Sequence, residues 1–220
     1  MADARVIAIV GAESTGKTEL ARALADALSA QGHRSTWVPE ALREWCDAHG
    51  RTPQQHEQAD IARLQAGRID AAAAAHDWVV ADTTALMTAV YSDIVFGDRS
   101  LDAEALRLHR RCTLTLLTAI DLPWVADGHQ RDGPQVREPV DARLRALLAA
   151  GGIGWSVVHG RGPLRLRAAW AACAPLGLSA APATGLFTRL QQTPAETGTW
   201  RCAECDDPDC ERHLARRRPV

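Results

Sequence analysis

The stretch RVIAIVGAESTGKTEL, residues 5–20, decides the fold of this chain. It begins with a β-branched, apolar run that ends at Gly11 and is typical of a buried strand. Leucines then recur at helical spacing from Leu20 onward. Between the strand and the helix, residues 11–18 match the pattern G-x-x-x-x-G-K-[ST] in full, which indicates a loop that binds nucleotide phosphates.

Each position of this phosphate loop has its own physical reason. The glycines allow a tight turn that points backbone N–H groups at phosphate oxygens, and the following helix adds its N-terminal dipole. Lys17 is the only lysine in the chain and reaches the β- and γ-phosphates, where a planar guanidinium would be too wide. The hydroxyl of Thr18 binds Mg²⁺. The predicted ATP-binding residues of the loop are Gly11, Ala12, Glu13, Ser14, Thr15, Gly16, Lys17 and Thr18.

Further apolar runs alternate with helical segments along the chain. We predict strands at 33–40, 77–84, 112–120 and 154–160, and helices at 16–30, 41–49, 53–76, 85–96, 102–110, 140–150 and 163–174. This alternation predicts an α/β fold with a doubly wound parallel sheet of five strands in the order 2-3-1-4-5. The composition shifts to Ala, Pro, Thr and Gly after Gly177, so we expect a phosphate-loop domain at 1–177 and a small C-terminal extension at 178–220.

The bulk composition bounds the partners and the compartment. The chain has 220 residues, 46% hydrophobic and 24% charged, which is ordinary for a globular domain. Its net charge of −2 gives no electrostatic reason to expect nucleic acid or an anionic membrane as partner. No apolar run reaches the roughly 18 residues that cross a bilayer, and the N-terminus lacks a signal-peptide pattern. We therefore expect a cytoplasmic protein, and no pattern indicates its oligomeric state.

Missing motifs narrow the class of nucleotide-binding protein. A common GTPase carries Asn-Lys-x-Asp, which is excluded because the single lysine is Lys17. A motor ATPase usually ends its third strand in Asp-Glu, whereas here Asp82 is followed by Thr83. A small-molecule phosphotransferase or a nucleotide-gated switch remains.

Two carboxylates follow predicted strands. Asp82 would hold Mg²⁺ beside Thr18, although it could instead cap the next helix. Glu40 ends the second strand, at the edge where doubly wound sheets bind ligands, and could deprotonate or orient an acceptor hydroxyl. The alternative for Glu40 is a first-turn helix acid. The choice of general base between these two acids stays open, and Arg43 is either an ion-pair partner of Glu40 or a substrate contact.

The polar loop at 121–139 has the length and the glycines of a lid that closes over phosphates. Its arginines, Arg131 and Arg137, would stabilise charge on the transferring phosphoryl group. Trp124 could stack on an aromatic substrate or be a packing residue. Asp127 could bind a ribose hydroxyl or form a turn.

The segment 159–169 follows the last predicted strand. In such folds this turn often lies against the adenine, so we place Arg161 and Arg165 near the base or the phosphates. The alternative is a plain connection with a solvated arginine face.

Four stretches, GAESTGKT, VPEALREW, ADTTALMTAVYS and DLPWVADGHQR, occur in this order within residues 6–172. Together they resemble the kinase domain of NadR-type nicotinamide riboside kinases, P-loop, AAA-type enzymes of NAD metabolism. That group carries GxESxGK[ST], a strand ending in Glu, Asp-Thr on the third strand and a D-x-P-W-x-x-D-G lid. The lid here continues Gly-His-Gln-Arg where the group has Gly-x-Arg, which affects the alignment of Arg131.

The resemblance implies ATP-dependent phosphorylation of the 5′-hydroxyl of nicotinamide riboside. It implies that Glu40 and Asp82 lie near the hydroxyl and the metal, and that Trp124 and Asp127 lie near the substrate. Two alternatives remain open: a kinase for another nucleoside or metabolite, and a nucleotide-binding switch whose C-terminal extension docks a protein or nucleic acid.

The C-terminal extension contains a cluster of soft metal ligands. Cys202, Cys205, Cys210 and His213 have the spacing C-x2-C-x4-C-x2-H, which can close a tetrahedral Zn²⁺ site. Its role would be structural, because four protein ligands leave no open position. The alternative is a disordered tail with incidental thiols.

Overall fold

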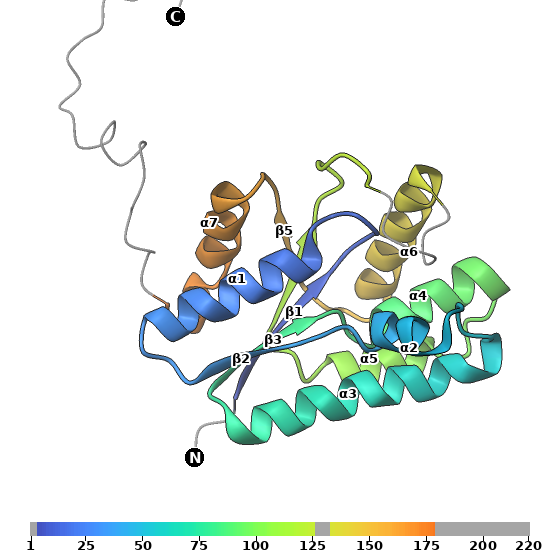
Figure 1. Ribbon diagram of the computed structural model, residues 1–220, viewed down its shortest axis with the longest axis horizontal. Helices are drawn as coiled ribbons and strands as arrows, with labels where there is room; N and C mark the ends of the chain where they lie inside the picture. The colour runs from blue at the N-terminus through green and yellow to red at the C-terminus, as the bar shows by residue number, and fades with distance from the viewer. Residues whose placement is uncertain (1–3, 126–132, 179–220) are drawn as a thin grey trace, which may run out of the picture. The chain divides into compact units, whose positions relative to one another are not determined.

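The computed structural model describes residues 4–125 and 133–178, which form a five-stranded parallel sheet covered by helices (Figure 1). The strand order is β2-β3-β1-β4-β5, as the sequence predicts. All neighbouring strands pair in parallel. The strands are β1 (Arg5–Val10), β2 (Ser35–Val38), β3 (Trp78–Asp82), β4 (Leu114–Thr118) and β5 (Ser156–Val158).

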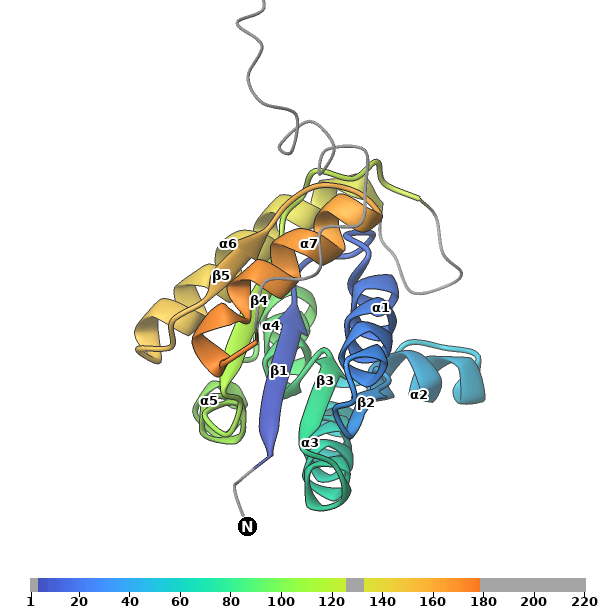
Figure 2. The same ribbon diagram turned by 90° about the vertical axis from the view of Figure 1, so that its left-hand side faces the viewer.

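Helices cover both faces of this sheet. Figures 1 and 2 show α1 and α7 side by side over one face, whereas α3, α4, α5 and α6 lie over the other. The helices are α1 (Lys17–Ala30), α2 (Ala41–His49), α3 (Gln58–Ala75), α4 (Ala85–Phe96), α5 (Asp102–His109), α6 (Arg137–Ala150) and α7 (Pro163–Ala172), with short 3₁₀ turns η1 (Gln55–Glu57), η3 (Pro134–Val136) and η4 (Ala174–Leu176).

The alternation of side chains along β1 explains the two-sided packing. Ile7 and Ile9 are fully buried under α1 and α7, together with Trp170. Val6 packs on the opposite face with α3, and Val10 packs there with α4 and α6. Successive residues of a strand point to opposite faces, so a strand covered on both sides must be apolar throughout.

Two helices begin three or more residues away from their predicted starts, for identifiable reasons. The helix predicted at 53–76 begins at Gln58, after η1, because Gln54 and Glu57 form a capping box just before it. The helix predicted at 140–150 begins at Arg137 and contains Pro139. Proline is tolerated in a first helical turn, where its missing N–H has no partner to lose. The last part of the predicted lid is therefore helical.

The carboxyl ends of the strands meet at one edge of the sheet. Ile9 on β1 pairs with Asp82 on β3, so the end of β3 lies beside the start of the phosphate loop. Glu40 follows β2 and Asp121 follows β4 at the same edge. This topology gathers polar residues from four separate parts of the chain, as open α/β sheets do at their ligand sites.

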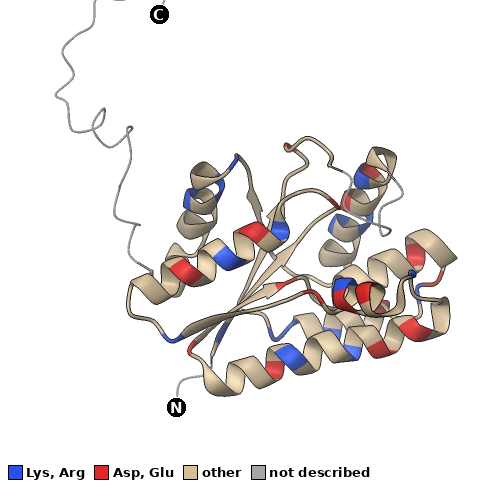
Figure 3. Cartoon of the chain, in the orientation of Figure 1, with Lys and Arg blue, Asp and Glu red and all other residues tan. Residues whose placement is uncertain are grey.

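The described residues all belong to the first of the two units into which the chain divides, residues 1–181. The predicted extension at 178–220 lies almost entirely outside the described residues, so the predicted boundary stays a prediction. No helix in the described part of the chain is long and apolar enough to span a membrane. Acidic and basic residues are interspersed along α1 and α3 (Figure 3).

Candidate active site

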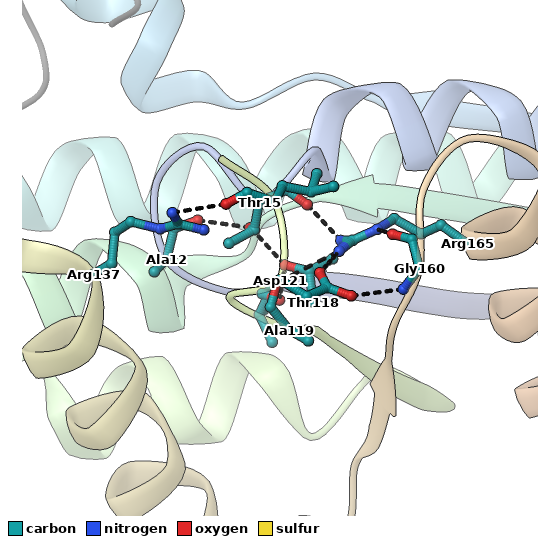
Figure 4. Close-up of polar contacts among 10 residues, drawn as sticks. Ala12, Thr15, Thr118, Ala119, Asp121, Arg137, Gly160 and Arg165 are labelled. Atoms are coloured by element: carbon teal, nitrogen blue, oxygen red, sulfur yellow. Dashed lines mark hydrogen bonds and ion pairs between the residues drawn. The ribbon is translucent and has the colours of Figure 1, made fainter. Parts of the chain in front are cut away.

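The phosphate loop, residues 11–18, is held by its own side chains and by β4. The hydroxyl of Thr15 donates to the carbonyl oxygen of Ala12 at 2.8 Å and lies 2.7 Å from the hydroxyl of Thr118 (Figure 4). Gly11 has a φ of +148°, and a Cβ there would lie 2.2 Å from the Thr118 hydroxyl. Only glycine allows this close approach of the loop to β4. The turn of the loop is therefore fixed by Gly11, by the Thr15 hydroxyl and by the contact with Thr118.

Lys17 is buried at the first position of α1. Its Nζ donates a hydrogen bond of 2.9 Å to the carbonyl oxygen of Ala12, which keeps the ammonium inside the loop. The N-cap of α1 is Gly16, in the left-handed region with a φ of +73°. This geometry leaves the ammonium and the helix N-terminus together, the arrangement that binds phosphates elsewhere.

Asp82 is 1% exposed at the end of β3, and its Oδ1 has no hydrogen-bond partner in the described structure. Burial raises the pKa of its carboxyl, whereas a hydrogen bond with the Thr18 hydroxyl and the Lys17 ammonium nearby lower it. A buried carboxylate oxygen in need of a partner, beside a hydroxyl, is a fitting oxygen-ligand set for Mg²⁺. The described residues contain no group of three or more His, Cys, Asp or Glu side chains that could hold a metal ion.

A pocket of about 180 Å³ connects the phosphate loop with the end of β2. Glu40 lies in it at 9% exposure, and its Oε2 is 3.7 Å from Nε of Arg43. The ion pair expected for Arg43 is thus present, and Arg43 also faces the pocket. The lining comprises Glu13, Lys17, Glu40, Leu42, Arg43, Cys46, Thr52, Pro53, Gln58, Tyr91, Val95 and Phe96. We call it the acceptor pocket, because Lys17 and a carboxylate open into the same cavity.

Gln65 connects the two carboxylate-bearing turns, a role that sequence reasoning missed. It is 3% exposed on α3. Its side-chain oxygen accepts from the backbone N–H of Ala41 at 2.6 Å, and its amide nitrogen donates to the carbonyl oxygen of Thr83 at 3.4 Å. Thr83 has a φ of +69°, which is strained for a β-branched residue. Glu40 and Asp82 are therefore positioned through one buried amide.

Arg165 contacts the phosphate loop and also lines a pocket between α1 and α7, and its predicted contact with ATP stays a prediction. It is 4% exposed, so its face of α7 is not solvated. Its guanidinium donates to the carbonyl oxygens of Thr15 and Gly160 at 2.5 and 2.7 Å and pairs with Asp121 (Figure 4). Asp121 in turn accepts from the N–H of Gly160 at 2.6 Å. With its donors directed at the protein, Arg165 supports the phosphate loop from behind.

Arg161 is exposed and lines a second pocket, between α1 and the first turn of α7. Leu20, Leu122, Pro163 and Leu166 give this pocket apolar walls. An apolar pocket beside the phosphate loop is suited to a nucleotide base. The predicted contact of Arg161 with ATP stays a prediction.

Arg137 is 6% exposed at the N-terminus of α6. Its Nη1 donates to the carbonyl oxygen of Leu122 at 2.9 Å, whereas Nε and Nη2 are buried with no partner in the described structure. Leu122 itself reaches Gly16 of the loop. A buried guanidinium with unsatisfied N–H groups beside a phosphate loop is suited to an incoming anion. The role of Arg137 at the transferring phosphoryl group stays a prediction.

The remaining predicted site residues either do not line the acceptor pocket or lie outside the described residues. Trp124 is partly buried and is not among the residues that line the acceptor pocket, whose aromatic side chains are Tyr91 and Phe96 of α4. The start of the lid contacts the loop through Ser14 and Val125, which exchange two hydrogen bonds of 2.9 Å. Outside the described residues lie Asp127, Arg131, Cys202, Cys205, Cys210 and His213.

Comparison with known proteins finds one protein family whose match includes both the phosphate loop and the strands of the sheet. The AAA domain family matches residues 6–166. This chain belongs to that family. Among solved structures, the AAA domain here is similar to a NadR protein in complex with NAD and AMP-PNP, with a TM-score of 0.63 and 19% identity over 80% of this chain and 50% of that one. A NadR protein in complex with NR is similar with a TM-score of 0.68 and 20% identity, over 83% of this chain and 54% of that one.

The resemblance to NadR that the motifs indicate is thus confirmed at the level of the fold. The chain spans about half the length of the NadR chains that it matches. No curated protein matches its sequence.

Proposed function

We propose that this AAA domain transfers the γ-phosphoryl group of MgATP to a hydroxyl of a nucleoside-like acceptor. The observation that carries the proposal is the acceptor pocket, into which both Lys17 and Glu40 open. Phosphoryl transfer needs a phosphate-binding cation and a hydroxyl-orienting carboxylate in one cavity. A switch that only hydrolyses ATP has no need of a separate pocket beside its phosphate loop.

The donor side of the reaction uses the phosphate loop and two further cations. Backbone N–H groups of residues 11–18 and the Lys17 ammonium bind the phosphates. Thr18 and Asp82 would hold Mg²⁺, which neutralises charge on the phosphates when it is bound. Arg137 donates its unsatisfied N–H groups to the transferring phosphoryl group, where negative charge spreads in the transition state.

The acceptor side uses Glu40. Its carboxylate is held in the pocket by Arg43 and accepts the proton of the attacking hydroxyl, or orients that hydroxyl, as phosphorus is attacked. Asp82 is assigned to the metal rather than to the proton, because its Oδ1 is buried next to Thr18 and Lys17. Tyr91, Val95 and Phe96 offer an apolar wall for an aromatic ring.

Nicotinamide riboside is our first candidate for the acceptor. The lid motif in residues 121–128 supports it, as does the similarity of the fold to a NadR protein solved with NR. In this proposal Trp124 and Asp127 contact the substrate when the lid closes, and Arg131 contacts the phosphates.

The test is ADP release from MgATP in the presence of a panel of nucleosides, with mass spectrometry of the product. We expect nicotinamide riboside to stimulate ADP release and to gain one phosphate. The variant Lys17→Met gives the background rate. Slow ATP turnover that no nucleoside or small hydroxyl metabolite stimulates would reject the kinase and favour a nucleotide-binding switch.

A further inference from the structure

The charges of the acceptor pocket are not fully paired within the part of the chain that the structure describes. The pocket holds two acids, Glu13 and Glu40, and two cations, Lys17 and Arg43. Lys17 donates to the carbonyl oxygen of Ala12, and Glu40 pairs with Arg43. Oε2 of Glu13, in contrast, is buried and accepts no hydrogen bond in the described structure. Among the described residues, this carboxylate oxygen of the pocket lacks a partner.

The backbone of the phosphate loop explains why this side chain faces the pocket. The loop turns sharply around Glu13, since Gly11 has a φ of +148° and Ser14 a φ of +56°. Thr15 fixes that turn through its bond to Ala12. The inner side of the loop receives phosphates, and a carboxylate directed there would repel them. Directed outward, Glu13 lines the acceptor pocket instead.

We propose that the Glu13 carboxylate accepts a hydrogen bond from a sugar hydroxyl of the acceptor and thereby selects substrates that carry this hydroxyl. The inference rests on the proposed kinase function and assigns to Glu13 a role at the acceptor, in addition to the ATP contact of its backbone. Its residue type is essential here, because a buried carboxylate oxygen needs a donor and cannot supply one.

The distribution of polarity in the pocket favours a sugar hydroxyl over a base as the partner of Glu13. Glu13 and Lys17 belong to the same loop, so a group bound by Glu13 lies near the phosphates and near the hydroxyl that reacts. The apolar lining belongs to other elements than the loop. Tyr91, Val95 and Phe96 come from the C-terminal half of α4, and Leu42, Cys46 and Pro53 come from α2 and the segment after it. A nucleoside has its sugar at the reacting end and its ring at the other, which matches this order.

If the acceptor lacks this hydroxyl, Oε2 of Glu13 remains buried without a partner after the acceptor has bound. Sites built to hydrogen-bond a substrate hydroxyl reject analogues that lack it for this reason. A hydrogen bond to a charged group corresponds to a factor of about 10 to 100 in kcat/KM. Discrimination against a deoxy analogue should have that size, and it should depend on Glu13.

The experiment compares wild-type protein, Glu13→Ala and Glu13→Gln on a ribonucleoside acceptor and its 2′-deoxy and 3′-deoxy analogues. Asp26→Asn, an exposed acid on α1, is the matched control for loss of one charge. We expect Glu13→Ala to lower kcat/KM for the ribonucleoside about 10- to 100-fold. For at least one deoxy analogue the loss should be under about 3-fold, because the hydrogen bond is already missing.

The KM for ATP should remain at the wild-type value in Glu13→Ala, and Glu13→Gln should lie between Glu13→Ala and wild type, since its amide oxygen still accepts. Calorimetric titration with the ribonucleoside gives a readout independent of turnover and should show the same order of affinities. Unchanged thermal unfolding of the variants separates the effect from misfolding.

Equal losses on the ribonucleoside and on both deoxy analogues would overturn the inference, as would no loss at all or a loss confined to the KM for ATP. In each of these cases the wild-type protein still phosphorylates the ribonucleoside, so the proposed function survives. If wild-type protein neither binds nor phosphorylates any ribonucleoside, the proposed function fails and the role of Glu13 fails with it.

Discussion

Nη1 of Arg165 donates a hydrogen bond of 2.5 Å to the carbonyl oxygen of Thr15, which joins α7 to the phosphate loop across 150 positions of sequence. The same guanidinium pairs with Asp121 after β4. One buried side chain thus connects three of the loops at the carboxyl edge of the sheet. The geometry of the phosphate loop therefore depends in part on Arg165 of α7, a helix far along the chain from the loop.

Replacing Arg165 with Met should therefore weaken both the fold and ATP binding. We expect the free energy of unfolding to fall by about 2–3 kcal/mol. This is less than breaking a fully buried ion pair usually costs, because the Asp121 side chain is about a third exposed and water screens it. Urea unfolding measures the loss, and Arg167→Met, an exposed arginine on the same helix, is the control. Asp121→Asn in the Arg165→Met background should recover part of the loss, and equal stability of Arg165→Met and Arg167→Met would contradict this role.

Lys17→Arg should keep the fold and lose phosphoryl transfer by about 100-fold or more, because the planar guanidinium does not fit where Nζ now contacts the Ala12 carbonyl. The kinase assay measures the rate, and thermal unfolding checks the fold. Arg22→Lys, an exposed position on the same helix, makes the reverse exchange as a control. Near-normal turnover of Lys17→Arg would show that the loop is not the active site.

Arg137→Met should lower kcat by about 100-fold while the KM for the acceptor changes little, because its unsatisfied N–H groups are needed mainly for charge in the transition state. Removing a buried cation that has no acid partner among the described residues should not destabilise the protein. Arg145→Met, on the same helix and paired with Asp141, is the control. A variant that loses acceptor affinity instead of kcat would assign Arg137 to ground-state binding.

Asp82→Asn should raise the unfolding temperature of the ligand-free protein and remove its stabilisation by MgATP. Burial raises the pKa of the Asp82 carboxyl in the folded state, so its ionised form costs stability. That cost grows as the pH rises above 3.8, the pKa of the carboxyl in the unfolded chain. The gain in stability of the variant over wild type should therefore be largest at neutral pH and absent in strong acid. Thermal unfolding with and without MgATP measures both effects. An undiminished shift with MgATP would show that Asp82 does not hold the metal.

His109 should make the fold sensitive to mild acid. Its ring nitrogens lie 2.9 and 2.8 Å from the hydroxyls of Thr84 and Thr115, and burial lowers its pKa from 6.5 to about 4. The unfolded chain therefore binds a proton first, and stability falls as the pH drops from 6.5 towards 4, by about 3 kcal/mol in total. Above pH 6.5 His109 adds no pH dependence.

Urea unfolding of wild type and His109→Gln at several pH values isolates this contribution. The variant should lack most of the acid-dependent loss, whereas His56→Gln, an exposed histidine, should retain it. Parallel pH profiles for wild type and His109→Gln would mean that His109 is not the responsible group.

The sequence predicts the fold well because its signals are local. β1 is apolar at every position after Arg5, which requires helices on both faces, and the motif at residues 11–18 requires a strand before it and a helix after it. Asp82 and Glu40 could be placed at the site because parallel strands end at one edge. Prediction was poorer where no local rule applies, as at Arg137, which starts a helix rather than sitting in a loop.

The sequence by itself determined the sheet and the phosphate loop, which follow from short-range periodicity and from a contiguous motif, and the fold class that these indicate supplied the strand order. Only the tertiary structure decided what individual side chains do there. Arg165 and Arg161 are close in sequence, yet one is buried against the phosphate loop and the other is exposed, because Arg165 lies on the inward face of α7 and Arg161 precedes that helix. Gln65, Tyr91 and Glu13 acquire their positions at the site in the same way, from contacts between segments that are distant along the chain.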